Sequence, residues 1–212
     1  MIIRTVFFMF FFIVTLLSVE VKSQVSDEIE LTDRQIRALQ SLNNSPYQQP
    51  TLQQRKSIRV KVSKLKDNQG QDYLGALVSR AELSPYLTTL ETVLGTDFQH
   101  FRALQAARDH QTFHLTILSP LEYQLADKTL VEKLLAPDFN NTFSSQLNVT
   151  LQGLGKVEQD DKKTFFVVAQ SSDAQLIRQR FLLTAKDFHV TLGFDPSDIY
   201  NVKKDHTTLL TF

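Results

Sequence analysis

The sequence predicts an α+β domain with two pseudo-symmetric lobes, in which two antiparallel sheets flank a central groove and helices lie on the outside. Two observations predict this architecture. A five-residue pattern occurs twice, 75 residues apart, at residues 113–117 (FHLTI) and 188–192 (FHVTL). A strand and then a helix also precede each copy in the same order, although the two halves share too little identity to form a sequence repeat.

Each copy of the pattern alternates apolar and polar side chains with period two. On a β-strand, this spacing places His114 with Thr116, and His189 with Thr191, on one face, while the apolar side chains face the other way. Four of the five histidines begin a His-x-Thr triplet, but only these two have apolar residues on both sides. Two such strands across a cleft supply two imidazoles and two hydroxyls, which suffice for metal-free acid–base chemistry on a phosphate ester.

Two strands and two helices are predicted before the first motif. Residues 57–63 alternate apolar and basic side chains, and residues 73–78 form a continuous apolar run, so both are expected to be strands. Leucines recur at helical spacing over residues 83–94, and a weaker helical pattern covers residues 97–107. The first motif strand then spans residues 112–118.

A helix is predicted directly after the first motif. Ser119 and Glu122 form a capping box, and Pro120 occupies the first helical position. The helix is expected to run to about residue 135 and to stop at Pro137.

The second half repeats this plan. Strands are expected at residues 147–157 and 164–169, because apolar side chains alternate in the first and are continuous in the second. A helix capped by Ser172 follows, and the second motif strand spans residues 187–194.

The N-terminus has the features of a secretory signal peptide. A basic start, an apolar run over residues 6–19 and small residues up to Ser23 predict cleavage after residue 23. The run is shorter than the roughly 20 apolar residues of a membrane span, so no stable span is expected, with an uncleaved anchor as the alternative. Residues 24–56 read as a polar linker with a short helix, and residues 57–212 as one domain. The expected location is secreted, periplasmic or lumenal.

The charge balance argues against a long nucleic-acid partner. The chain has 23 basic and 23 acidic residues, and a protein that tracks a phosphate backbone carries a basic excess. A small or terminal phosphate fits better. The chain has no cysteine, which excludes disulfides, thiol nucleophiles and cysteine metal sites. We expect a monomer.

These residues resemble the 2H phosphoesterase superfamily, which is defined by two His-x-Thr/Ser motifs on opposed strands. The closer resemblance is to its Swiss-army-knife RNA-repair-like branch. It rests on residues 113–123 (FHLTILSPLEY), 188–194 (FHVTLGF) and the tail 198–205 (DIYNVKKD), and it covers residues 57–212. In this branch the third tail position is often His followed by Gly, whereas Tyr200 and Asn201 stand there in this chain.

The resemblance implies a mechanism for the two motifs. One of His114 and His189 would act as general base and the other would protonate the leaving oxygen, since imidazole titrates near neutrality. Thr116 and Thr191 would donate hydrogen bonds to the non-bridging phosphate oxygens. Neither a metal nor another cofactor is implied, and the sequence leaves open which histidine is the acid.

Three further side chains are candidates for substrate binding. Lys203 and Lys204 follow the second motif and would place a cation beside the phosphate, unless they are solvated surface lysines. Tyr123 would stack on a base or ribose, unless it packs at the start of its helix.

Three functions remain open from the sequence. The first is an exported, metal-independent phosphoesterase acting on 2′,3′-cyclic phosphates or short RNA ends. The second is a non-catalytic module that holds a nucleotide or a phosphorylated ligand in the same groove. The third is a zinc protein using His114, His189 and Asp187, although no characteristic ligand spacing is present.

Overall fold

The computed structural model describes residues 55–136 and 145–211, so the predicted leader and most of the predicted linker lie outside the described residues. No helix in the described ranges is long and apolar enough to span a membrane. The regular elements are β1 (Lys56–Lys66), β2 (Asp72–Leu77), α2 (Arg80–Leu94), η1 (Gly95–Asp97), α3 (Phe98–Arg108), β3 (His114–Leu118), α4 (Pro120–Leu125), α5 (Lys128–Leu135), β4 (Gln146–Gln159), β5 (Lys162–Gln170), α6 (Ser172–Arg180), β6 (Phe188–Asp195) and η2 (His206–Thr208).

The six strands form one closed antiparallel barrel in the order β1-β2-β3-β6-β5-β4. The α+β class is therefore confirmed, but the prediction of two separate sheets flanking a groove is wrong. Two junctions close the barrel. Six residues of β1 pair with β4, from Lys56 to Lys61, whereas β3 and β6 meet at the pair Leu115–Val190.

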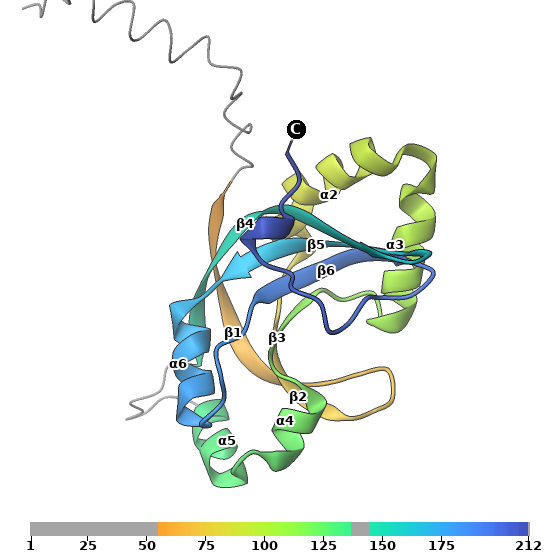
Figure 1. The fold of residues 1–212 in the computed structure, drawn as a ribbon. Coiled ribbons are helices and arrows are strands. Elements are labelled where there is room, and N and C mark those ends of the chain that lie inside the picture. The colour runs from red at the N-terminus through yellow and green to blue at the C-terminus, as the bar shows by residue number, and fades with distance from the viewer. Residues whose placement is uncertain (1–54, 137–144, 212) are drawn as a thin grey trace, which may run out of the picture. The chain divides into compact units, whose positions relative to one another are not determined.

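The two halves of the chain share one order of elements. Each half has two paired strands, then helical structure, and then a motif strand, and the two motif strands are neighbours in the barrel. Figure 1 shows α2 and α3 together at one end of the barrel, while α4, α5 and α6 gather toward the other. The pseudo-symmetry therefore survives the closure of the barrel and brings the two motifs together.

The main core lies on the apolar face of the motif strands. Leu115 and Val190 are fully buried there with Leu83 and Leu90 of α2. The alternate side chains of the motifs, which include the histidines, lie on the opposite face. That face has buried apolar side chains of its own outside the main core cluster: Tyr73, Phe166, Val168, Phe194 and Ile199.

The predicted helix after the first motif is two helices. The capping box between Ser119 and Glu122 forms as expected and starts α4. The chain then breaks at Ala126, and Asp127 caps α5 by accepting from the backbone N–H groups of Thr129 and Leu130. The cap of α6 is Ser171 rather than Ser172, a shift of one residue.

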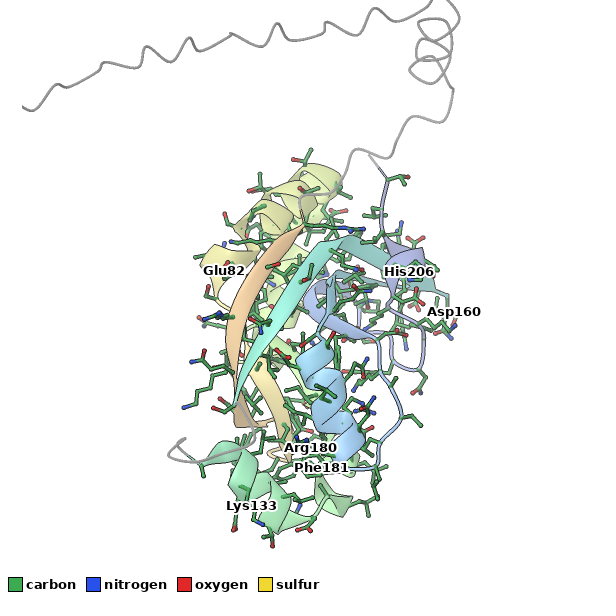
Figure 2. All side chains as sticks on the ribbon, turned by 90° about the vertical axis from the view of Figure 1, so that its left-hand side faces the viewer. Glu82, Lys133, Asp160, Arg180, Phe181 and His206 are labelled. Carbon is green, nitrogen blue, oxygen red and sulfur yellow. The ribbon has the colours of Figure 1, made fainter. Side chains whose placement is uncertain are left out.

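A buried ion pair links α4 to α6. Arg178 donates to the two carboxylate oxygens of Glu122 at 2.8 and 3.1 Å and to the backbone carbonyls of Ile117 and Thr184 at 2.6 and 2.8 Å. Figure 2 shows α6 beside the barrel strands, with Arg180 and Phe181 at its C-terminal end. Because Ile117 belongs to β3, this arginine also fixes the end of the first motif strand.

Low pH is expected to weaken the ion pair between Glu122 and Arg178. Burial alone would raise the pKa of Glu122, but Arg178 and the Ser119 N–H group lower it to about 2. The stabilisation is therefore full above the unfolded carboxylate pKa of about 4.3 and is lost as the pH falls through the folded pKa. We expect Glu122→Gln to lower the free energy of unfolding by about 2–3 kcal/mol at pH 7 and by far less at pH 2.

Urea denaturation at both pH values measures this difference. The matched control is Glu132→Gln, which removes an exposed carboxylate from α5. An equal loss for Glu122→Gln at pH 7 and pH 2 would show that the Glu122 charge does not carry the stabilisation.

Candidate active site

The register of β3 against β6 brings the two motifs together. The strands are antiparallel and pair at Leu115 and Val190, the middle residues of the two triplets. Continued by one residue in each direction, this register places His114 across from Thr191 and Thr116 across from His189. Cross-strand neighbours share a face of the sheet, with Cβ atoms about 4.5–5.5 Å apart. Each imidazole therefore has the hydroxyl of the other motif as its neighbour.

An aromatic ring supports each histidine. The ring of Tyr73 meets His114 edge to face at 5.5 Å, and the ring of Phe166 meets His189 at 5.6 Å. Such edge-to-face contacts favour one orientation of the imidazole.

A glycine makes room for each of these aromatic rings. A Cβ at Gly75 would lie 3.0 Å from the ring of Tyr73 and 2.8 Å from the carbonyl oxygen of Leu115. A Cβ at Gly155 would lie 2.7 Å from the ring of Phe166. In both halves of the barrel, a glycine therefore leaves room for the aromatic ring that contacts the histidine.

Both imidazoles favour the neutral form in the ligand-free protein. Burial lowers the pKa of His114, an effect that Asp109 and Asp198 oppose. Burial also lowers the pKa of His189, to about 3, and the positive charge of Lys204 adds to the shift. Among the described residues, the buried Nδ1 atom of His189 has no hydrogen-bond partner.

A buried network of four charged side chains adjoins the histidines. Arg108 binds Asp109 through two hydrogen bonds of 2.7 Å and also donates to Asp198. The other oxygen of Asp198 accepts from Lys204 at 3.0 Å. The side chains of Asp198, Lys204 and Asp109 are 3%, 5% and 7% exposed, so water screens these charges weakly.

The network is electrically balanced, with two carboxylates and two cations. Burial would raise the pKa of Asp198, but Lys204 and Arg108 lower it. Burial lowers the pKa of Lys204 even though Asp198 lies beside it. The ammonium group also lies over the ring of Phe166, at 5.5 Å from its centre, and thus on the ring that supports His189.

The predicted binding residues divide into two groups. Thr116 is half-buried and Thr191 is buried on the histidine face, and Lys204 is buried beside His189. Lys203 is exposed and makes no ion pair with a described residue. Tyr123 is packed in the main core, and the ammonium group of Lys128 lies 4.1 Å from its ring centre. The stacking role of Tyr123 stays a prediction.

Sequence reasoning missed most of the charged network. Arg108 and Asp109 end a helix, where charged residues are normally solvated, and Asp198 lies 90 residues away from Arg108. Asp198 was part of the tail that carries the family resemblance, and this was the available signal for it. The zinc alternative gains no support, because the described residues contain no cluster of three or more His, Cys, Asp or Glu side chains that could hold a metal.

The match to a family model defines the class of this protein as a 2H phosphoesterase. The family model described as "Swiss Army Knife, 2H phosphoesterase domain" matches residues 85–200, which is more than half of the chain and includes both motifs and Asp198. The chain belongs to this family, and the resemblance predicted from the sequence is confirmed. Proteins of this class are phosphoesterases. No curated protein and no solved structure matches the chain significantly.

Removing the charge of Lys204 should change the pH dependence of kcat/KM. Because this charge lowers the pKa of His189, Lys204→Met is expected to raise that pKa. The acidic limb of kcat/KM should then move to higher pH. Lys203→Met is the matched control, and it should leave the profile in place. Equal profiles for the two variants would contradict the placement of Lys204 beside His189.

Proposed function

We propose that the protein is an exported, metal-independent phosphoesterase that hydrolyses 2′,3′-cyclic phosphates or short RNA-end phosphodiesters. The observation that carries the proposal is the antiparallel register, which sets each histidine against the threonine of the other motif. The near-balanced charge of the chain favours a small or terminal phosphate over a long polyanion. The proposal that the protein is exported depends on the signal peptide predicted from the sequence.

The proposed reaction adds one water molecule across one P–O bond. One neutral imidazole takes a proton from water as the water oxygen attacks phosphorus. The P–O bond to the leaving ribose oxygen breaks, and the second imidazole, protonated at the start, gives its proton to that oxygen. Thr116 and Thr191 donate hydrogen bonds to the non-bridging oxygens, where negative charge builds up. The two histidines exchange protonation states, and solvent resets them.

The electrostatics favour one assignment of the acid and the base. His189 has the more strongly lowered pKa and Lys204 beside it, so it stays neutral and serves as the base. Burial also lowers the pKa of His114, but Asp109 opposes this shift there, so we assign His114 as the acid. A bound phosphate adds negative charge and raises both pKa values. The expected kcat/KM profile is bell-shaped, with its maximum below the ordinary imidazole pKa of about 6.5.

A panel of substrates tests this proposal. The EDTA-treated protein is incubated with 2′,3′-cyclic nucleotides, with RNA oligonucleotides that end in a cyclic phosphate and with linear dinucleotides. We expect turnover of the cyclic phosphates and little cleavage at the internal phosphodiesters of the oligonucleotides. Activity that EDTA abolishes and a divalent metal restores would contradict a metal-independent reaction.

The second candidate is a binding module without turnover. It is favoured by the lowered pKa values of both histidines, which leave the ligand-free site without a ready proton donor. Saturable binding of nucleotides by folded protein, with no product from any member of the panel, would support this function over catalysis.

A further inference from the structure

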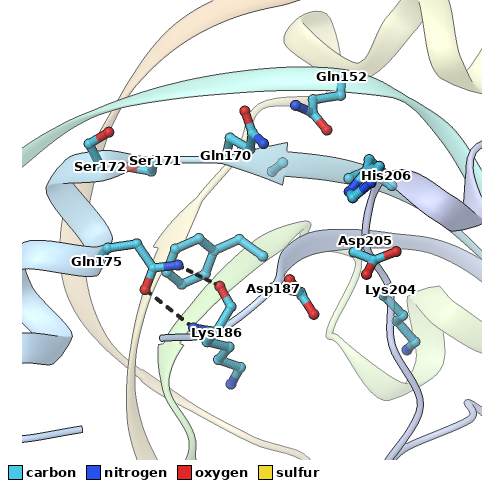
Figure 3. Close-up of a pocket in the computed structure, with 13 residues that line it drawn as sticks. Gln152, Gln170, Ser171, Ser172, Gln175, Lys186, Asp187, Lys204, Asp205 and His206 are labelled. Atoms are coloured by element: carbon cyan, nitrogen blue, oxygen red, sulfur yellow. Dashed lines mark hydrogen bonds between the residues drawn. The ribbon is translucent and has the colours of Figure 1, made fainter. Parts of the chain in front are cut away.

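A pocket of about 370 Å³ is lined by Asp187 and Phe188, the two residues directly before His189. Strands β4 and β5, the start of β6, the start of α6 and the C-terminal segment line it (Figure 3). Val168 in its wall pairs directly with His189 across β5 and β6, so the pocket adjoins the imidazole. Lys204 lines the pocket as well and connects it to the charged network. The volume lies within the roughly 300–1,000 Å³ of small-molecule sites.

Gln152 is a buried amide in the pocket wall with an unused acceptor. The residue is 8% exposed, and its Oε1 atom has no hydrogen-bond partner among the described residues. The register of β4 against β5 jumps between Leu151 and Gly153, which makes Gln152 the extra residue of a β-bulge. Bulges re-aim side chains beside active sites. Figure 3 shows the amide on the pocket side of β4, above Gln170.

Some of the other polar side chains in the pocket already make hydrogen bonds within the protein, and others do not. The amide of Gln175 is occupied, because it donates to the backbone carbonyl of Lys186 at 2.7 Å and accepts from the Lys186 N–H group at 3.2 Å. Ser171 caps α6 by accepting from Ala174 at 3.1 Å. Asp187 also lines the pocket, and its carboxylate makes no ion pair with a described residue.

The polar groups without a partner in the pocket indicate which chemical groups a ligand must carry. The Oε1 atom of Gln152 and the carboxylate of Asp187 are acceptors, so they need N–H or O–H donors. Asp187 is exposed, so solvent competes for its carboxylate, whereas the Oε1 atom of Gln152 is buried and lacks a partner among the described residues. The amide of Gln152 also carries two donors. A flat heterocycle with a donor and an acceptor on one edge meets these requirements.

We propose that this pocket is a nucleobase subsite and that Gln152 reads the hydrogen-bonding edge of the base. The inference rests on the proposed function, because it places the substrate phosphate between the two histidines and the base in the adjoining pocket. Gln152 then acts in specificity, and the buried amide finds in the ligand the partner that the described chain does not supply. Catalysis on phosphorus remains with the motif residues.

Binding measurements test the subsite independently of turnover. Calorimetry on the whole protein compares the four nucleoside 3′-monophosphates with ribose phosphate and with inorganic phosphate. At least one nucleotide should bind more tightly than ribose phosphate. Gln152→Leu should weaken that nucleotide roughly tenfold while inorganic phosphate binds as before. Gln159→Leu, which changes an exposed amide on the same strand, is the matched control.

The thermal midpoint and the rate of hydrolysis distinguish a failure of the subsite from misfolding and from a failure of the proposed catalysis. Replacing an unpartnered buried amide by leucine should keep the thermal midpoint the same or raise it, so weaker binding would not reflect misfolding. Equal affinity for nucleotides and ribose phosphate, or equal losses in the two leucine variants, would overturn the subsite. If nucleotides bind as expected but no phosphodiester is hydrolysed, the subsite stands and the proposed catalysis fails. Turnover without any preference among bases would support the catalysis and overturn the subsite.

Discussion

His189→Ala should lower kcat/KM for a 2′,3′-cyclic nucleotide by roughly 10²–10⁴-fold, the usual effect of losing one general acid or base. The register places this imidazole against Thr116, and the ring of Phe166 holds it at 5.6 Å. Alanine removes the proton acceptor and leaves the strand and its apolar face intact. Initial rates at several pH values measure the loss, and the acidic limb of the pH profile, which His189 sets as the base, should disappear together with most of the rate.

A matched control is available within the chain. His206 lines the neighbouring pocket rim and is exposed on the C-terminal segment, away from both motif strands in sequence. His206→Ala should leave the thermal midpoint of unfolding unchanged and should alter kcat far less than His189→Ala does. Similar losses of kcat in the two variants would contradict the assignment of the second motif as catalytic.

Asp198→Ala should lower the free energy of unfolding by about 3–5 kcal/mol, because it leaves two cations without their shared carboxylate in a buried place. Asp198 is 3% exposed at its side chain and contacts both Arg108 and Lys204. Arg108 keeps Asp109, so the uncompensated charge falls mainly on Lys204. Guanidinium denaturation measures the loss.

A double variant separates the charge from the volume of Asp198. Asp198→Asn keeps the shape of the side chain and removes its charge, and Lys204→Met then removes the cation left behind. The combination should recover much of the stability lost by Asp198→Asn alone, since removing both members of a buried pair is often nearly neutral. If Asp198→Ala costs less than about 1 kcal/mol, the network does not hold the C-terminal segment over the histidine face.

The sequence was sufficient to predict most of the elements, but not that the two motif strands are neighbours in one barrel. Strands were readable because period-two alternation survives folding, and the capping box at Ser119 formed as its residues predict. The break between α4 and α5 was missed, although Asp127 is a good cap, because the apolar periodicity continues across it. One of the two junctions that close the barrel, between β3 and β6, is formed by the cross-strand pair Leu115–Val190, which no local pattern encodes.

The rest of the candidate site depends on contacts between distant residues. Arg108 and Asp198 are 90 positions apart, so their partnership and burial cannot be read from either segment alone. The place of Gln152 in the site could not be predicted for a different reason. It occupies a bulge, where the alternation that assigns side chains to faces is interrupted. Buried charge and re-aimed polar side chains are therefore what the structure adds to the sequence analysis.

The most direct test of the two-histidine mechanism is the rate of cyclic-phosphate hydrolysis by EDTA-treated wild type, His114→Ala, His189→Ala and the double variant. If the imidazoles act as one acid–base pair, each single variant should lose about as much activity as the double variant, because residues that work as a unit are not additive. Turnover by the wild type that persists in either single variant, or losses that multiply in the double variant, would contradict the mechanism.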